Sequence, residues 1–247
     1  MSRDGSNSSS NKMIEVEMKV TYDESTKAKI LELATDKGSF QSFTDRYFDD
    51  DQYSLTTRDI WLRLRDETWE LKCPVTKQLA SMTSATSTST TSYYDMDDKR
   101  EIMNYLQHNG IIDPVTSDNV VDVDEYIDEL LARLEAKSIT PFAVIVTFRE
   151  SFNIVYKGQQ FRVDFDTTET SALKDYQLCE IELMVNDNES DRLIAQQQIQ
   201  QLCQELGLIP PNKLYGKVLE LIKRTRPDHW RALLDAKQKS VVATSSS

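Results

Sequence analysis

The stretch Glu15-Val16-Glu17-Met18-Lys19 places a charged residue at every second position, with one apolar residue between neighbouring charges. A spacing of two puts side chains on the same face of a β-strand. The segment is therefore expected to be a strand with one charged and one apolar face. Four later stretches repeat the pattern: Arg63-Leu64-Arg65, Glu70-Leu71-Lys72, Arg162-Val163-Asp164-Phe165-Asp166 and Glu180-Ile181-Glu182.

Most of these charged faces carry doublets of like charge, which repel each other unless something binds between them. Carboxylate doublets suit hard divalent cations, and arginine or lysine doublets suit phosphate oxygens. One chain that supplies both kinds is typical of a site for a metal-bound polyphosphate. A solvated strand face is the ordinary explanation of any single doublet. Here, however, five such charged stretches, some acidic and some basic, occur in one chain, which disfavours that explanation.

The pattern predicts an α+β fold. About eight or nine short strands, mostly in meander order, are expected between 13 and 185, with helical segments around 98–109 and 122–137 and further helices after 190. If helices cover the apolar faces, the charged faces must point at one another. We therefore expect an antiparallel β-barrel of roughly eight strands, a tunnel with a charged interior that is surrounded by helices.

A single domain is expected over residues 13–236. Residues 1–12 and 237–247 have compositions typical of disordered termini, and the Ser/Thr-rich tract at about 80–92 is expected to form a loop. A chain of 247 residues is long enough to bury a substantial core.

Composition limits the partners. The chain has 41 acidic and 29 basic residues, a net charge of −12, which disfavours broad nucleic-acid or anionic-membrane surfaces. No apolar run in the sequence approaches the ~20 residues that span a bilayer. Three scattered cysteines, Cys73, Cys179 and Cys203, argue against a disulfide framework or zinc site. A cytoplasmic protein is expected, with a monomer as the default.

The Glu15–Lys19 stretch also matches the ExExK signature of the CYTH family, the triphosphate tunnel metalloenzymes. Further blocks follow in order: Trp61-Leu62-Arg63-Leu64-Arg65, Trp69-Glu70-Leu71-Lys72-Cys73-Pro74, Arg162-Val163-Asp164-Phe165-Asp166-Thr167, Glu180-Ile181-Glu182 and Asn212-Lys213-Leu214. Together these blocks resemble the animal thiamine triphosphatase branch and span about 13–226. The resemblance implies an antiparallel barrel whose tunnel binds a small-molecule triphosphate with Mg²⁺, or with Mn²⁺ in its place.

Carried over residue by residue, the resemblance assigns two sets of side chains. The metal carboxylates are Glu15, Glu17, Asp164, Asp166, Glu180 and Glu182, and the phosphate-binding cations are Lys19, Arg63, Arg65, Lys72, Arg149, Arg162 and Lys213. The family usually has a Glu on the strand after the variable loop. This chain has Asp95 at that place, which is therefore added to the expected metal ligands; its side chain is one methylene shorter than that of Glu.

Two aromatic residues complete the candidate site. The strand around Tyr47 resembles one that carries a tyrosine paired with the lysine of the WELK block, so Tyr47 and Lys72 form a candidate catalytic dyad. The ammonium would favour the phenolate, which accepts a proton from water; an ordinary barrel-lining tyrosine is the alternative. Trp61 shares parity with Arg63 and is expected to face the interior, where a flat cationic thiazolium suits the indole. A plug at the barrel end is its alternative role.

The expected function is Mg²⁺-dependent hydrolysis of thiamine triphosphate to thiamine diphosphate and phosphate. Inorganic tripolyphosphatase activity is the first alternative, because every phosphate-binding residue would be shared. A non-catalytic polyphosphate-binding module is the alternative of another class. Adenylate cyclisation and RNA 5′-triphosphate removal, found in relatives, are disfavoured by the WELKCP and RVDFDT blocks and by the acidic balance.

Overall fold

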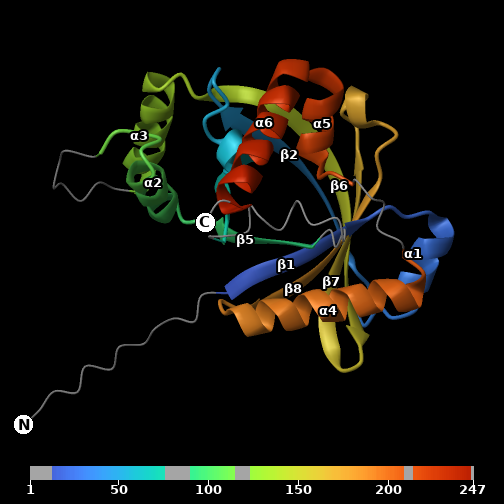
Figure 1. The fold of residues 1–247 in the computed structure, drawn as a ribbon. Coiled ribbons are helices and arrows are strands. Elements are labelled where there is room, and N and C mark those ends of the chain that lie inside the picture. The colour runs from blue at the N-terminus through green and yellow to red at the C-terminus, as the bar shows by residue number, and fades with distance from the viewer. Residues whose placement is uncertain (1–12, 76–89, 115–122, 209–213, 246–247) are drawn as a thin grey trace, which may run out of the picture.

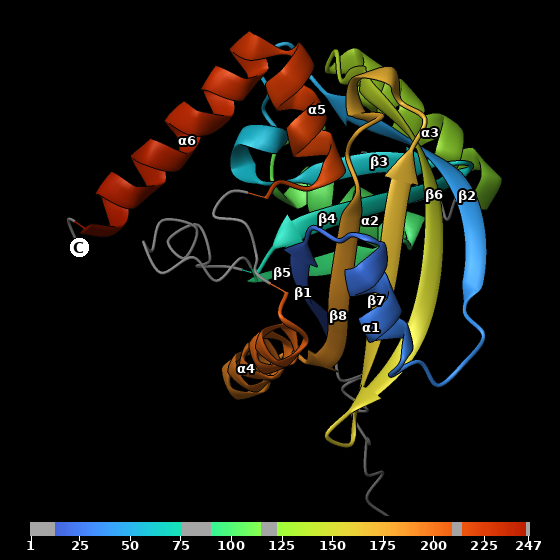
Figure 2. The same ribbon diagram turned by 90° about the vertical axis from the view of Figure 1, so that its right-hand side faces the viewer.

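The computed structural model describes residues 13–75, 90–114, 123–208 and 214–245. Eight strands form a closed antiparallel barrel in the order β1-β5-β4-β3-β2-β6-β7-β8 (Figures 1 and 2). The strands are β1 (Met13–Val20), β2 (Ser39–Asp49), β3 (Trp61–Arg65), β4 (Thr68–Pro74), β5 (Thr90–Met96), β6 (Thr140–Tyr156), β7 (Gln159–Thr168) and β8 (Leu178–Asn186). The predicted fold class is confirmed.

Helices surround this barrel. They are α1 (Glu24–Leu31), α2 (Lys99–His108), α3 (Val123–Ala136), α4 (Glu189–Leu206), α5 (Lys217–Thr225) and α6 (Pro227–Ser245), with short 3₁₀ turns η1 (Thr56–Arg58) and η3 (Ser171–Leu173). α4 packs on β1 and β8, whereas α5 and α6 lie on the opposite side (Figure 1). Over the described part of the chain, no helix has the length and apolar character required to cross a membrane.

The apolar faces of the strands point outward onto the helices. Val16 and Ile181 pack in one cluster with Ile199 of α4. On the other side, Leu62 and Leu71 share a second cluster with residues of α2. Burial of each such side chain stabilises the fold by about 1.5–3 kcal/mol. Because the apolar side chains point outward, the charged side chains at the alternate positions of the same strands point into the barrel.

Helix ends follow local sequence signals. The N-cap residue Asn188 accepts a hydrogen bond from the Asp191 backbone N–H at the start of α4, and Asp98 does the same for Glu101 at the start of α2. α4 ends at Gly207, whose φ of 71° lies in the left-handed region that glycine adopts without a Cβ clash. Between its caps, α4 packs along the β1–β8 side of the barrel through its apolar residues.

Two predicted boundaries are corrected. β5 begins at Thr90, so residues 90–92 of the expected loop pair with β1; β-branched threonine favours strands. α6 continues to Ser245, where a disordered tail from 237 was expected. The segment after Pro227 contains no glycine or proline that would end the helix. Each further residue in helical conformation adds one backbone hydrogen bond, so the helix continues. The termini 1–12 and the loop portion 80–89 lie outside the described residues.

His229 attaches α6 to the barrel end. Its Nε2 lies 2.7 Å from Thr56 Oγ1, and its ring stacks on Tyr53 with centroids 4.0 Å apart. Thr56 Oγ1 donates to Asp49 Oδ2 at 2.6 Å, so we assign the imidazole Nε2–H as the donor to Thr56. Burial lowers the pKa of His229 to about 4. The neutral imidazole therefore holds α6 against η1.

Candidate active site

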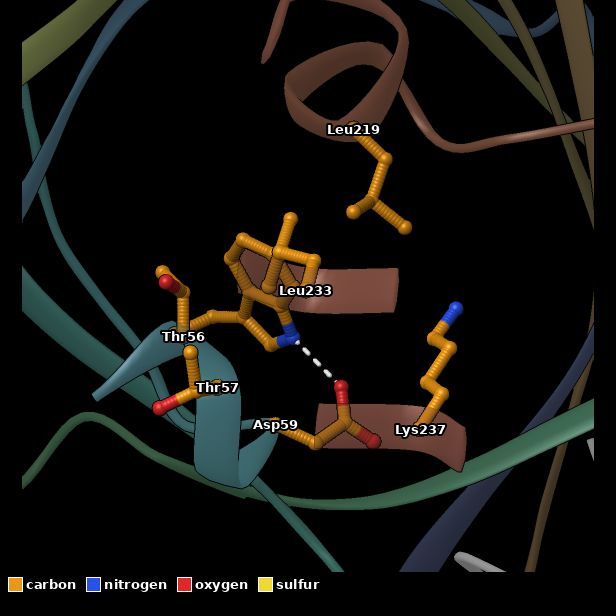
Figure 3. Close-up of a pocket in the computed structure, with 7 residues that line it drawn as sticks. Thr56, Thr57, Asp59, Leu219, Leu233 and Lys237 are labelled. Atoms are coloured by element: carbon orange, nitrogen blue, oxygen red, sulfur yellow. Dashed lines mark hydrogen bonds between the residues drawn. The ribbon is translucent and has the colours of Figure 1, made fainter. Parts of the chain in front are cut away.

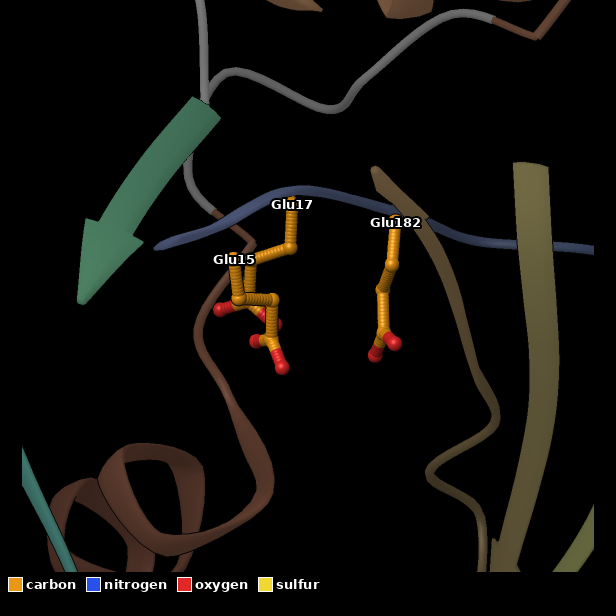
Figure 4. Close-up of side chains that lie close together, drawn as sticks. All are labelled: Glu15, Glu17 and Glu182. Carbon is orange, nitrogen blue, oxygen red and sulfur yellow. The ribbon is translucent and has the colours of Figure 1, made fainter. Parts of the chain in front are cut away.

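Carboxylates gather on three neighbouring strands inside the barrel. The register pairs Glu17 of β1 with Glu182 of β8, and Glu180 of β8 with Asp164 of β7. Two overlapping groups, Glu15 with Glu17 and Glu182, and Asp164 with Glu180 and Glu182, place ligand atoms within 4.8 Å of one another. Figure 4 shows the first group, with Glu15 and Glu17 projecting from β1 toward the same space as Glu182. Oxygen donors in such numbers suit Mg²⁺ or Mn²⁺.

Two glutamates of β8 differ sharply in electrostatic surroundings. Burial favours the protonated form of Glu180, but Lys217, Lys19 and Arg149 hold its pKa well below the usual range. Burial, with Glu15 and Glu180 as neighbouring carboxylates, instead raises the pKa of Glu182 to about 9. Glu182 therefore lies where negative charge exceeds positive charge.

The arginine doublet occupies β3. Arg63 Nε donates to Glu70 at 2.8 Å, and Arg65 donates to Asp45 at 2.8 and 3.1 Å. Burial would raise the pKa of Asp45, but the two guanidinium groups hold it below the ordinary value. The side chains of Arg63 and Arg65 are 13% and 23% exposed. The guanidinium groups of Arg63 and Arg65 are thus oriented by carboxylates and remain partly accessible to solvent.

Two lysines lie among the carboxylates. Lys19 bonds to Glu17 and lies 3.4 Å from Glu180. Burial would lower the pKa of Lys19, yet these carboxylates raise it. Lys72 Nζ lies 3.0 Å from Glu15 and 3.1 Å from Asp95. Burial would lower the pKa of Lys72, but these neighbouring carboxylates raise it well above the usual value. Both side chains therefore remain ammonium groups.

Arg149 joins three buried carboxylates. It donates to Asp166 at 2.7 and 2.6 Å and to Glu180 at 2.7 Å, and its Nη1 lies 2.6 Å from Asp164. Lys217, at the start of α5, bonds the same Asp166. Asp166, expected among the metal ligands, is thus neutralised by an arginine and a lysine. It stands outside both carboxylate groups that could share an ion among the described residues.

The remaining predicted cations and acids are placed as follows. Arg162 is half-exposed and bonds Asp164 at 3.0 Å, with Glu182 at 3.9 Å. Asp95 pairs with Lys72 and also stands outside those two carboxylate groups of the described chain. Lys213 lies outside the described residues, and the helix expected after the two prolines is described from Lys217 onward, as α5.

The expected contact between Tyr47 and Lys72 is not among the interactions within the described chain. The Tyr47 hydroxyl instead accepts a hydrogen bond from Arg63 Nη1 at 3.3 Å. The strand order explains this result: Tyr47 pairs with Arg63, whereas Lys72, one strand further along, pairs with Trp61. β3 therefore separates the two members of the predicted dyad.

Trp61 lies at the barrel end nearest α5 and α6. Its ring is buried with Tyr47 and Leu221, whereas its neighbour Leu62 belongs to the outer cluster. The indole therefore has the inward parity that was predicted. Its Nε1 donates to Asp59 at 2.8 Å, which places it at the rim rather than between the arginines.

Sequence reasoning missed several residues of the site. Asp45 shared the parity of Phe43 and Tyr47, which was a usable signal. Lys217 had no such signal, because only the packing of α5 brings it to Asp166. Asp59 follows η1 and reaches the interior through contacts with Trp61 and Tyr93. A strand-based pattern cannot find residues that enter from helices and turns.

Comparison with known proteins agrees with this geometry. The CYTH domain model matches residues 13–215. Thiamine-triphosphatase of Homo sapiens is 27% identical over 229 residues, 90% of each chain, and that of Macaca fascicularis is 26% identical over the same coverage.

Solved structures support the fold. A protein from Pyrococcus horikoshii superposes with a TM-score of 0.53 at 18% identity, over 86% of this chain and 99% of that one. A putative adenylate cyclase from Vibrio parahaemolyticus has a TM-score of 0.52 at 15% identity, over 84% and 97% of the two chains. Because the family match spans nearly the whole barrel, this chain belongs to the CYTH family.

Proposed function

We propose that this protein is a metal-dependent triphosphatase that converts thiamine triphosphate to thiamine diphosphate and phosphate. The observation that carries the proposal is the meeting of two kinds of charge inside one closed barrel. Carboxylate groups with ligand atoms within 4.8 Å project from β1, β7 and β8, and the order of strands in the closed barrel puts the Arg63–Arg65 doublet of β3 on the opposite wall. The similarity to curated thiamine-triphosphatases supports the choice of substrate.

The residues fit a divalent cation. Glu15, Glu17 and Glu182 would hold one, and Asp164 and Glu180 extend the same set. The raised pKa of Glu182 supports this assignment, because it marks a place that lacks positive charge. When bound, Mg²⁺ or Mn²⁺ would neutralise charge on the phosphate oxygens.

The cationic side chains would align the triphosphate. Phosphoryl transfer depends mainly on alignment and charge neutralisation. Arg63 and Arg65 present planar forks that match phosphate oxygens, and they would exchange part of their contacts with Glu70 and Asp45 for the substrate. Lys19 and Lys72 would add point charges beside the carboxylates.

Tyr47 would orient the attacking water. Its side chain is buried, and its hydroxyl is held by Arg63 at 3.3 Å. We retain Lys72 as the second proposed catalytic group, acting on the phosphates from the other side of β3. Arg63, rather than Lys72, is then the cation that positions the tyrosine.

Inorganic tripolyphosphatase activity is the second candidate. It is favoured by one observation: the carboxylates, Arg63 and Arg65 all lie within the barrel. These residues could bind the phosphates of a substrate that carries no organic group. Purified protein with Mg²⁺ should be given thiamine triphosphate, tripolyphosphate and ATP. Preferential phosphate release from thiamine triphosphate supports the proposal, and release from tripolyphosphate alone supports the second candidate. Binding without release would indicate a non-catalytic module.

The expectations about partners and setting also remain proposals. We propose a monomer that acts on a small molecule, without nucleic acid or membrane partners. None of Cys73, Cys179 and Cys203 forms a disulfide, and all are buried, which is compatible with the proposed cytoplasmic setting.

Replacing Trp61 with leucine should weaken thiamine triphosphate selectively. Loss of the indole face removes cation–π contact of up to about 2 kcal/mol, so kcat/KM is expected to fall roughly 10-fold or more. Tripolyphosphate hydrolysis should change little, and both are measured as initial rates of phosphate release. Trp69→Leu is the matched control, because Trp69 is buried in the outer cluster. Equal losses on both substrates would contradict the stacking role.

Metal binding should release protons. The pKa of Glu182 is about 9, so this group is protonated at pH 7.5 and must ionise to act as a ligand. We expect release of about one proton per ion and a metal affinity that weakens as pH falls from about 9. Titration calorimetry in two buffers of different ionisation enthalpy measures the proton count. A count near zero at pH 7.5 would refute this assignment.

A further inference from the structure

Phe43 is a buried aromatic residue on the inner face of the barrel. On β2 it lies two residues before Asp45 and four before Tyr47, so these three side chains point to the same side of the strand. Phe43 is buried, yet it belongs to none of the three apolar clusters found in the described part of the chain. Packing in an apolar core therefore does not account for its position.

Two guanidinium groups lie over the ring of Phe43. The Cζ atom of Arg65 is 4.0 Å from the ring centroid, and the Cζ atom of Arg149 is 5.6 Å from it. A cation within about 6 Å of the centroid is attracted to the face of an aromatic ring, and this attraction is larger where water is excluded. Both arginines are largely removed from solvent. The ring thus gives these cations a favourable contact that an aliphatic side chain would not supply.

The strand register places Phe43 between the two arginines. Arg65 of β3 pairs with Asp45, the next inward residue of β2, and Thr147 of β6 pairs with Phe43 itself. Arg149 is the next inward residue of β6 after Thr147. The ring is therefore a diagonal cross-strand neighbour of both guanidinium groups, which is within reach of aromatic and long side chains.

Trp61, the other aromatic residue discussed for the site, has different surroundings. Its Nε1 donates to Asp59 at 2.8 Å, at the barrel rim where Leu219 and Leu233 line the same small pocket (Figure 3). The indole also belongs to an apolar cluster that does not include Phe43. Of these two aromatic residues, Phe43 is the one whose ring lies against the arginines expected to bind phosphate.

An aromatic ring and a carboxylate hold an arginine in different ways. Asp45 accepts two hydrogen bonds from Arg65, at 2.8 and 3.1 Å, and a phosphate would need the same N–H donors. The Phe43 ring attracts the charge of the guanidinium group without accepting a conventional hydrogen bond. When a phosphate displaces Asp45, the contact with the ring can remain. The Arg65 side chain then keeps its order and does not have to be immobilised on binding.

We propose that Phe43 is a positioning residue for phosphate binding: by cation–π attraction it holds the Arg65 guanidinium in place while the N–H donors change partners from Asp45 to phosphate. This inference rests on the proposed triphosphatase function and adds to it a residue that acts through Arg65. Arg149 is farther from the ring and is held by three carboxylates, so its position depends less on Phe43. Because the role concerns phosphate alone, thiamine triphosphate and tripolyphosphate should depend on it equally.

Phe43→Leu removes the aromatic face and retains an apolar side chain. Ordering a long side chain on binding costs affinity, so KM for both substrates should rise about 3- to 10-fold, with kcat changed by less than about twofold. Phe148→Leu is the matched control, because Phe148 lies on the outer face of β6, where it stacks on Phe40. A thermal melt of each variant checks that it is folded.

Fluorinated phenylalanines at position 43 separate the charge distribution of the ring from its volume. Each added fluorine withdraws electron density from the ring face and weakens its attraction for a cation, whereas the shape of the side chain changes little. KM for tripolyphosphate should therefore rise stepwise through mono-, di- and trifluorinated phenylalanine. A KM that stays within about twofold along this series would overturn the proposal, because a ring that only fills space would behave in that way.

Chemical modification of Arg65 provides a readout that needs no turnover. Phenylglyoxal reacts with guanidinium groups, and mass spectrometry of peptides gives its rate at each arginine. In the substrate-free protein, Arg65 should react at least about threefold faster in the trifluorinated variant, because the ring restrains it less. Arg162, which is half-exposed and belongs to β7, should react at an unchanged rate and serves as the internal reference.

The two measurements separate the role of Phe43 from the proposed function. An Arg65 modification rate that is the same in the trifluorinated variant and in the unchanged protein would overturn the positioning role. If the unchanged protein hydrolyses neither thiamine triphosphate nor tripolyphosphate, the proposed function fails. The modification rates of Arg65 then decide the role of Phe43 by themselves.

Discussion

Replacing Glu182 with glutamine is expected to remove nearly all turnover while making the metal-free protein more stable at pH 8. Glu182 belongs to both carboxylate groups that place ligand atoms within 4.8 Å. Loss of an outer-shell partner already reduces metal affinity or activity by 10–100-fold, so loss of a shared ligand should lower activity by roughly 100-fold or more. Phosphate release under saturating Mg²⁺ measures this effect.

The stability gain has a defined pH window. The folded-state pKa of Glu182 is raised to about 9 from an ordinary 4.5. Below about pH 4.5 the group is protonated in both the folded and the unfolded state. As the pH rises toward 9, ionisation favours the unfolded state and the stability of the metal-free protein falls. Glutamine does not ionise, so this component of the decline is absent from the variant.

Thermal melts in a chelator at pH 5, 6.5 and 8 measure the difference. The melting temperature of Glu182→Gln should exceed that of the unchanged protein by an amount that grows with pH. Glu205→Gln is the matched control, because Glu205 is half-exposed and pairs with Lys157 at 2.7 Å. A constant difference across the three pH values would show that Glu182 does not titrate as described.

Replacing Arg149 with methionine is expected to cause the largest loss of stability. Arg149 is 8% exposed and contacts Asp164, Asp166 and Glu180. Removal of one partner from a buried ionic network costs about 3–5 kcal/mol, because the remaining charges lose their compensation. For a chain of this size the melting temperature should fall by about 10 °C or more.

Arg162→Met is the matched control for Arg149. Arg162 is also on the carboxylate side, but its side chain is 49% exposed and its closest carboxylate contact is Asp164 at 3.0 Å. An exposed ion pair contributes roughly 0–1 kcal/mol. Chemical denaturation of both variants at pH 7.5 gives the two free energies of unfolding. Similar losses for both would show that burial does not determine the strength of this network.

Much of the fold follows from local patterns. Alternation in segments such as Glu15–Lys19 and Glu180–Glu182 predicted strands with opposite apolar and charged faces. The β1 and β8 segments behave as predicted, with Val16 and Ile181 packed under α4. The parity rule succeeds because covalent geometry sends successive strand side chains to opposite faces, whatever the remote environment.

Contacts between charges were less predictable. Tyr47 was expected to meet Lys72, but the strand order places Arg63 beside it. Asp166 was assigned to the metal together with Asp164, yet Arg149 and Lys217 neutralise it. Charge type alone did not distinguish these possibilities, because an ion pair depends on distance and on the other charges nearby.

Residue order along the chain thus specified the strands, their apolar sides and the chemical types lining the interior. Barrel closure and helix packing decided which of these groups meet. Glu180 and Glu182 lie two residues apart, yet one is surrounded by cations and the other by carboxylates. The physical reason is that secondary structure follows from nearest-neighbour geometry, whereas the energy of a charge is set by groups brought together from distant parts of the chain.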